Sequence, residues 1–227
     1  RLDRLDAAGL VAALDSPNGW QRDKAQQLLV WRNDRAAVPH LEKLAHDSLN
    51  PRARLHALCS LDGLDALKPE LVGHALADPQ PGIRENALRL AEPRGTPTVV
   101  AAAVRLVSDP DAKVRLQLAY SLGQWSDPRA GAALGQLAVT SHADHFLTAA
   151  VMSSAVPHAR AAVEAVAQAG GPALSALMEP LVNLALGLND RATLARLLQP
   201  ALTAAGRFTP EQVGAFFGVP LIEGQHV

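Results

Sequence analysis

The sequence predicts an all-α fold, an α-solenoid of stacked helix pairs, and two observations lead to that prediction. A pattern recurs about every 31 residues, in stretches that open at Asp15, Asp47, Asp78 and Asp109. Each stretch lies between a short apolar segment and a segment whose apolar residues recur at helical spacing. A fixed period of this length is typical of stacked supersecondary units. A single helix pair cannot bury its apolar face alone, so neighbouring pairs must cover one another.

The first helix of each predicted pair is short and apolar, and a turn marked by proline follows it. The four apolar runs span residues 9–14, 37–45, 70–77 and 99–107. Proline in the turn fixes φ and removes a backbone donor, which ends the helix. Asp and Ser precede the second helix, and we expect them to be its N-cap residues, because their side-chain oxygens accept free backbone N–H groups.

An arginine recurs in every second helix, six or seven residues after the aspartate, and an apolar residue follows three places later. The arginines are Arg22, Arg54, Arg84 and Arg115, and the apolar residues are Ala25, Ala57, Ala87 and Leu118. Recurring carboxylates and guanidinium groups invite a catalytic interpretation. Their periodicity favours a structural one, since residues present in every unit serve what every unit needs, namely helix capping and pairing between repeats.

The period fades towards the C-terminus, so the predicted organisation has three parts. Residues 1–155 are predicted to form about five helix pairs, the last of them an eroded copy of the pattern that begins at Ser141. Residues 156–205 are predicted to continue as degenerate helical repeats. Residues 206–227 are predicted to be a C-terminal capping segment that docks Phe208, Phe216 and Phe217.

Composition and charge narrow the classes of function. The 227 residues are 48% hydrophobic but only 4% aromatic, which predicts a core of Ala and Leu. With 21 basic against 22 acidic residues there is no basic excess, so we expect no nucleic-acid partner. The longest apolar run, near residues 165–178, is too short to span a bilayer, so we expect no membrane insertion. A single cysteine excludes a disulfide framework.

One face of the second helices is a candidate binding surface. Positions two, five and nine residues after the recurring arginine share this face, and most of them are polar. They are Lys24, Gln27, Trp31, His56, Cys59, Gly63, Asn86, Arg89, Pro93, Gln117, Tyr120 and Gln124. The face is either an ordinary solvated surface or a surface for another domain or chain. Aromatic residues and Arg favour interfaces, so the partner-binding candidates are Trp31, Asn86, Arg89, Gln117 and Tyr120.

No catalytic, metal-binding or cofactor-binding residue is predicted. His56 and Cys59 lie three residues apart, but two ligands are fewer than a zinc site needs. His142 and His145, with Asp144 between them, form a denser cluster, for which a polar helix start is the better interpretation. Cys59 is expected to be a small core thiol rather than a nucleophile.

Two stretches carry a family resemblance. DPDAKVRLQLAYSLG from Asp109 and DPQPGIRENALRLA from Asp78 resemble a HEAT repeat of the short bacterial type, over roughly residues 8–155. More narrowly, DSPNGWQRDKAQQLL, NPRARLHALCSLDGL and PGIRENALRLAEP are similar to the HEAT segment of large exported bacterial proteins. In that family the segment lies between a sugar-dehydrogenase-like β-propeller and a C-terminal c-type haem domain. This chain has no blade repeat and no Cys-x-x-Cys-His, so no residue here is assigned to redox chemistry.

The expected function is that of a non-catalytic HEAT-repeat scaffold that orients neighbouring domains or binds a protein partner. The chain begins at Arg1 within the repeat pattern, which predicts a fragment of a larger protein. The narrower resemblance implies that this parent is a redox protein, periplasmic or exported, and that the partners are its adjacent domains. The alternative is a HEAT-like enzyme, since short HEAT repeats also build bilin lyases and base-excision DNA glycosylases.

Overall fold

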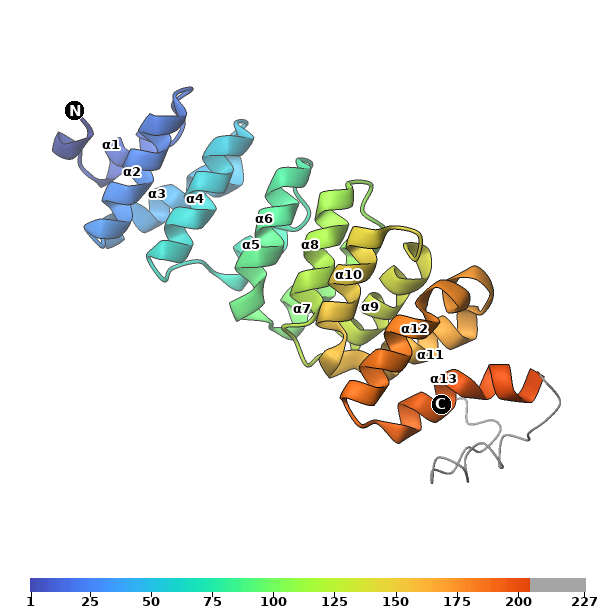
Figure 1. The fold of residues 1–227 in the computed structure, drawn as a ribbon. Coiled ribbons are helices and arrows are strands. Elements are labelled where there is room, and N and C mark those ends of the chain that lie inside the picture. The colour runs from blue at the N-terminus through green and yellow to red at the C-terminus, as the bar shows by residue number, and fades with distance from the viewer. Residues whose placement is uncertain (205–227) are drawn as a thin grey trace. The chain divides into compact units, whose positions relative to one another are not determined.

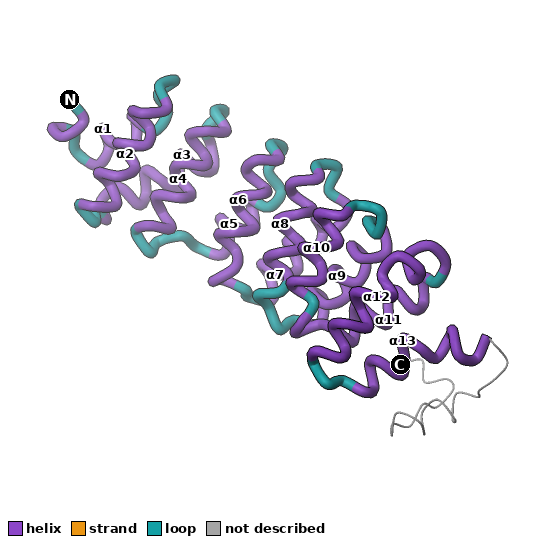
Figure 2. Tube along the Cα trace, viewed as in Figure 1, coloured by secondary structure: helices purple, strands orange, loops and turns teal. Residues whose placement is uncertain are grey.

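The computed structural model describes residues 1–204, and these residues form helices and loops without a strand (Figures 1 and 2). The chain divides into two compact units, Arg1–Ala103 and Val104–Val227. Each unit is a stack of helices, and the predicted all-α solenoid of helix pairs is confirmed. The predicted capping segment 206–227, with Phe208, Phe216 and Phe217, lies outside the described residues.

Unit 1 contains three complete helix pairs and one further helix. Its elements are η1 (Leu2–Arg4), α1 (Ala7–Ala13), α2 (Gly19–Trp31), η2 (Arg35–Ala37), α3 (Val38–Asp47), α4 (Pro51–Gly63), α5 (Pro69–Ala75), α6 (Pro81–Ala91), η3 (Glu92–Arg94) and α7 (Pro97–Ala103). The first helices α1, α3, α5 and α7 contact one another in succession, as do the second helices α2, α4 and α6. Leucines such as Leu10, Leu29 and Leu58 are buried between them.

Unit 2 repeats this arrangement and continues it beyond the region of clear periodicity. Its elements are η4 (Val104–Ser108), α8 (Ala112–Leu122), α9 (Pro128–Thr140), α10 (His145–Ser154), η5 (Val156–His158), α11 (Ala159–Ala169), α12 (Gly171–Gly187) and α13 (Arg191–Ala204). Helix α8 contacts α10, and α9 contacts α11. A Cβ on Gly135 would lie 2.7 Å from the Cβ of Ala165, so α9 and α11 approach closely because both residues are small.

Each recurring arginine binds the turn that precedes its own helix. Its Nη1 donates to the carbonyl oxygen of the residue six places earlier. The bonds join Arg22 to Ser16, Arg54 to Ser48, Arg84 to Asp78 and Arg115 to Asp109, at 2.7, 2.8, 2.9 and 2.7 Å. The guanidinium thereby satisfies a turn carbonyl after the first helix, where helical partners have run out. This is a structural role, as the periodicity predicts.

The structure corrects the alignment of the repeats and the predicted N-caps. The residues equivalent to Asp78 and Asp109 are Ser16 and Ser48, each one place after the aspartate at which the pattern opens. In all four of these residues the side chain accepts a hydrogen bond from the backbone N–H of the residue two places later, at 2.8–3.1 Å. The N-caps of the second helices are instead Asn18, Asn50, Gln80 and Asp111. The predicted capping residues therefore close the turn before the helix, because a turn of two residues still separates them from its first residue.

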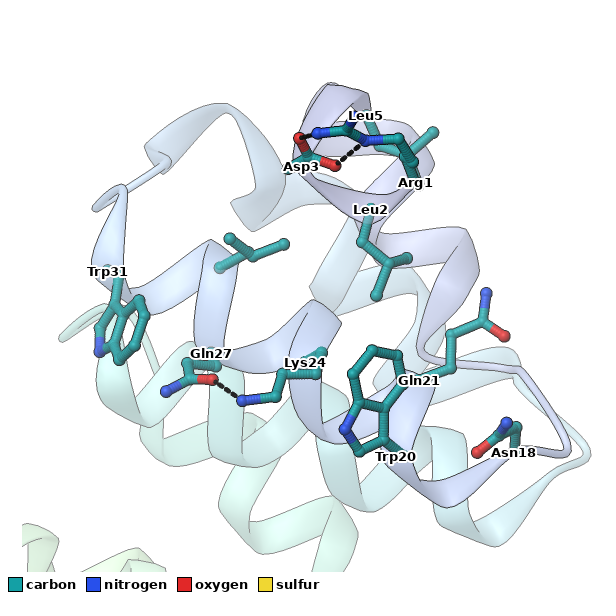
Figure 3. Close-up of a pocket in the computed structure, with 11 residues that line it drawn as sticks. Arg1, Leu2, Asp3, Leu5, Asn18, Trp20, Gln21, Lys24, Gln27 and Trp31 are labelled. Atoms are coloured by element: carbon teal, nitrogen blue, oxygen red, sulfur yellow. Dashed lines mark hydrogen bonds and ion pairs between the residues drawn. The ribbon is translucent and has the colours of Figure 1, made fainter.

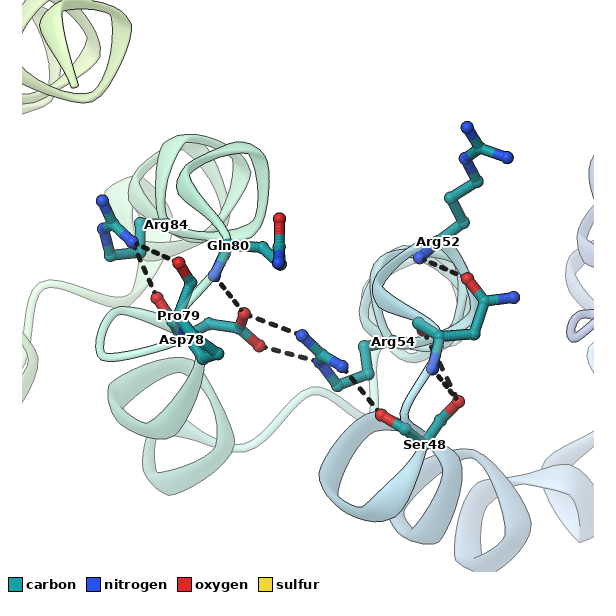
Figure 4. A network of polar contacts seen from close by, with 8 residues as sticks. Ser48, Arg52, Arg54, Asp78, Pro79, Gln80 and Arg84 are labelled. Atoms are coloured by element: carbon teal, nitrogen blue, oxygen red, sulfur yellow. Dashed lines mark hydrogen bonds and ion pairs between the residues drawn. The ribbon is translucent and has the colours of Figure 1, made fainter.

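A buried ion pair joins the second and third repeats of unit 1 (Figure 4). Arg54 donates from Nε and Nη2 to the two carboxylate oxygens of Asp78, both at 2.8 Å. The side chains are only 10% and 4% exposed. Asp78 also accepts the backbone N–H of Gln80. Because charge-assisted, bidentate hydrogen bonds are the strong ones, this carboxylate ties α4 firmly to the turn that begins α6.

The junction between the first and second repeats lacks this carboxylate. Arg22 is the equivalent of Arg54, and Ser48 stands where Asp78 stands one repeat later. Arg22 is 9% exposed, and its Nε has no hydrogen-bond partner among the described residues. A buried donor without a partner costs about 1–3 kcal/mol. The first junction therefore lacks the buried ion pair of the second and leaves one guanidinium donor without a partner among the described residues.

Removing the carboxylate of Asp78 is expected to destabilise the chain. Asp78→Ala leaves the guanidinium of Arg54 buried without its counter-ion, which lowers the free energy of unfolding by about 3 kcal/mol. Asp47→Ala is the matched control, because the Asp47 side chain is 53% exposed, and its effect should be under about 0.5 kcal/mol. Urea denaturation followed by circular dichroism measures both. Equal midpoints for the two variants would contradict the role of the pair.

Supplying the missing carboxylate is expected to stabilise the chain. Ser48→Asp places an acceptor opposite the unpaired Nε of Arg22 and retains an oxygen for the N–H of Asn50. A hydrogen bond to a charged group contributes about 1.5–3 kcal/mol, so the free energy of unfolding should rise by about 1.5 kcal/mol. In an Arg22→Met background the same substitution should bring no gain. A gain that persists there would show that the carboxylate acts elsewhere.

Candidate functional site

The predicted partner-binding residues belong to both units. Trp31, the last residue of α2, is 74% exposed, and Tyr120 on α8 is 46% exposed. Arg89 on α6 is exposed and its Nη2 lies 3.1 Å from Oε1 of Glu85. Asn86 is half-buried, and its amide donates to the carbonyl of Gly82 within the same helix. Trp31, Asn86 and Arg89 lie in unit 1, and Tyr120 lies in unit 2.

Gln117, another of the predicted partner-binding residues, is buried. Its side chain is folded against its own helix, where Nε2 donates to Oγ of Ser121 at 3.2 Å. The same position in α4 is also not a free surface, since the Nδ1–H of His56 donates to Oε1 of Gln26 on α2 at 2.7 Å. Polar residues two places after the arginine are therefore not a reliable sign of a solvated face, because in α4 this position faces the preceding helix.

The face of α4 that meets α2 ends in a glycine. A Cβ on Gly63 would lie 2.8 Å from Cγ2 of Val30, so α2 and α4 approach closely at this point. Thirty-two residues earlier, the same face of α2 carries large side chains. Gln21, Lys24, Leu28 and Trp31 occupy the positions of Ala53, His56, Ser60 and Gly63.

A groove of about 590 Å³ follows this face, between η1 and α2 (Figure 3). Its apolar walls come from Leu2, Leu5 and Leu28, together with the indoles of Trp20 and Trp31. The two indoles lie on either side of Lys24 and Gln27, whose side chains bond each other at 2.8 Å (Figure 3). Trp20 is 65% exposed. The groove thus combines two exposed aromatic rings with a polar floor.

Arg32 holds the outer wall of the groove in place. Its guanidinium donates to the carbonyl oxygens of Leu5 and Asp3, both at 2.8 Å. Arg1 and Asp3 form an ion pair at the rim, with Nη2 and Oδ2 2.6 Å apart. The η1 segment is therefore bonded to the residue that follows α2, and it forms the outer wall of the groove.

Sequence reasoning identified Trp31 but missed Trp20. The sequence does contain a pattern that includes it, a stripe with steps of four, three and four residues formed by Trp20, Lys24, Gln27 and Trp31. Such steps place side chains along one face of a helix. Trp20 precedes the arginine by two residues, outside the columns counted from it, so the pattern of the repeat hid its place in the stripe.

A second hollow of about 400 Å³ lies between α3 and α5, on the first helices of unit 1. The rings of His46 and His74 stack there with centroids 4.5 Å apart. Oε1 of Glu42 lies 2.7 Å from Nζ of Lys68. Within residues 1–204, no group of three or more His, Cys, Asp or Glu side chains is placed to hold a metal ion. The histidine pair thus supplies too few ligands for a site.

The predicted cluster at residues 142–145 forms a helix start. Asp144 is the N-cap of α10, and its carboxylate accepts the backbone N–H groups of Phe146 and Leu147. His142 donates from Nδ1 to the carbonyl of Val139 at 2.8 Å. The carboxylate of Asp144 is therefore engaged by the backbone of its own helix.

Cys59 and His56 lack the electrostatics of a nucleophile and its base. Cys59 is half-buried rather than fully within the core. Burial raises the pKa of its thiol, and the charge of Asp62 raises it further. Burial also lowers the pKa of His56, as does the nearby charge of Arg22. A reactive cysteine needs a lowered pKa, so both shifts oppose formation of a thiolate–imidazolium pair.

The thiol of Cys59 is expected to react slowly in the folded chain. A raised pKa leaves little thiolate at neutral pH, and the thiolate is the reactive form. Ellman's reagent should modify the native chain more slowly than the urea-unfolded chain, and Cys59→Ser should not react. Faster reaction of the native chain would reveal an activated cysteine.

Comparisons with known proteins agree with the repeat architecture. In the part of the chain that the structure describes, no helix is both long and apolar enough to cross a membrane. No curated protein matches the sequence. Residues 64–155, less than half of the chain, match the family model of HEAT repeats. This match supports a HEAT-repeat protein, and HEAT repeats commonly serve as protein-interaction scaffolds.

Proposed function

We propose that this chain is a non-catalytic HEAT-repeat scaffold that binds a protein partner through the groove between η1 and α2. The observation that carries the proposal is the pair of exposed indoles, Trp20 and Trp31, on one face of α2. Only 4% of the residues are aromatic, so two exposed tryptophans in one groove are unusual for this chain. Binding energy at protein interfaces concentrates in buried aromatic and Arg anchors.

Arg89 and Tyr120 provide further exposed anchors of the same chemical kind. Arg89 lies on α6 in unit 1, and Tyr120 lies on α8 in unit 2. Each is a residue type that interfaces favour over the remaining surface. A scaffold that contacts several neighbouring domains needs more than one such place, and these two residues are the ones we assign to it.

The proposed parent is a larger redox protein, and the proposed partners are its adjacent domains. This part rests on the resemblance of three stretches in residues 15–93 to the HEAT segment of exported proteins that also carry a propeller and a haem domain. In such a setting the chain orients the redox domains and contributes no group to electron transfer, because it contains no Cys-x-x-Cys-His.

Substitution of the anchors is expected to weaken docking without unfolding the chain. Proteins retained by the immobilised chain are identified by mass spectrometry, and the dissociation constant of a purified partner is then measured. Trp31→Ala and Arg89→Ala should each weaken binding by over roughly 1 kcal/mol. Phe146→Ala is the matched control, since Phe146 is 77% exposed and lies outside the groove.

Two results would count against the scaffold. The first is a partner that binds Trp31→Ala and Arg89→Ala as tightly as the parent chain. The second is duplex DNA binding that falls steeply as salt rises, which is the signature of phosphate contacts. That result would favour an enzyme of the glycosylase type, and uptake of a bilin on mixing would favour a lyase.

A further inference from the structure

We propose that the junction between the first and second repeats of unit 1 binds a small monovalent anion such as chloride, held by the buried guanidinium of Arg22. This site does not depend on the proposed protein-binding function. The inference follows from the donors of Arg22 that lack a partner, from the carboxylate that the equivalent arginine binds, and from the serine that stands in place of that carboxylate.

The guanidinium of Arg22 is buried, and its hydrogen bonds leave part of it without an acceptor. The residue is 9% exposed. Its hydrogen bonds to the described residues are the two that Nη1 donates, at 2.7 Å to the carbonyl of Ser16 and at 3.1 Å to that of Pro17. Nε has no partner among these residues. Because a buried charge is costly unless it is paired and hydrogen-bonded, this cation favours the uptake of an anion.

Arg54 shows where the anion would lie (Figure 4). Its Nη1 donates to the carbonyl of Ser48 at 2.8 Å, as Nη1 of Arg22 donates to that of Ser16. The planar guanidinium therefore turns the same edge, formed by Nε and Nη2, towards the next turn in both repeats. In Arg54 this edge binds the two carboxylate oxygens of Asp78, both at 2.8 Å. In Arg22 the same edge faces Ser48.

Ser48 offers space and a further donor beside this edge. Serine ends in a hydroxyl where aspartate carries a larger carboxylate. The Oγ of Ser48 accepts the backbone N–H of Asn50 at 3.1 Å, and its own hydrogen has only the carbonyl of Asn50 at 3.5 Å, which is long for such a bond. The hydroxyl can therefore donate to an anion together with Arg22. A single spherical acceptor such as chloride needs less room than a carboxylate ligand.

The acidic residues close to Arg22 in sequence or space do not neutralise it. Oδ1 of Asp15 accepts a hydrogen bond from Asn50, and the side chain of Asp23 is 71% exposed. Neither forms an ion pair with Arg22. Burial lowers the pKa of His56 on α4, and the charge of Arg22 lowers it further. An anion bound beside Arg22 would offset this charge, so its presence should raise the pKa of His56.

The first test measures the thermal stability of the intact chain. Sodium chloride replaces sodium gluconate at constant ionic strength, because gluconate is too large for the site. The melting temperature of the parent chain should rise by about 2–4 °C and level off as the site fills. Arg22→Met removes the donors, and Ser48→Asp supplies a carboxylate within the chain, so neither variant should respond to chloride. Asp47→Ala is the matched control, since that side chain is 53% exposed, and it should respond like the parent.

The second test measures the pKa of His56 by NMR, with its signal assigned by the His56→Gln variant. In the parent chain this pKa should be higher in chloride than in gluconate, whereas in Ser48→Asp the two values should agree. A melting temperature that is the same in both salts would show that water alone serves Arg22, and would overturn the proposal. A chloride response that persists in both Arg22→Met and Ser48→Asp, or that leaves the pKa of His56 unchanged, would place the anion elsewhere and overturn it as well.

Discussion

The recurring arginine of the second helix is the interaction on which this architecture depends. In four successive repeats its guanidinium binds the carbonyl six residues earlier, and so sets the path of the chain between the two helices. Where an aspartate occupies the next turn, as Asp78 does, the same guanidinium also joins one repeat to the next. One side chain thereby shapes the unit and couples it to its neighbour.

The coupling is uneven along unit 1, and sequence explains why. Ser48 replaces the aspartate at the first junction, which leaves Nε of the buried Arg22 unpaired. Hydrogen bonds across this junction include the one between His56 and Gln26 and the one that Asn50 donates to the carboxylate of Asp15. Since stability in repeat proteins is close to a sum of unit and interface terms, the ion pair contributes at the second junction and has no counterpart at the first.

The candidate site lies on the face of α2 that corresponds to the face of α4 in contact with α2. Where α4 packs against α2, a Cβ on Gly63 would lie 2.8 Å from Cγ2 of Val30. At the positions of Ser60 and Gly63, α2 carries Leu28 and Trp31, and these side chains line the groove. This difference between α2 and α4 is the reason that we place the proposed binding site on α2.

The sequence by itself determined the helical class, the period and the structural role of the arginines, because these depend on local spacing that recurs in every unit. It also singled out Trp31. Only the tertiary structure decided which residue of each turn faces the arginine, since Asp15 and Ser16 are adjacent and both polar. It likewise revealed that Gln117 is buried and that Trp20 shares a groove with Trp31. The burial of a side chain depends on which helix packs against it. A period of about 31 residues predicts which helices are neighbours, but it does not predict which face of each helix the neighbour covers.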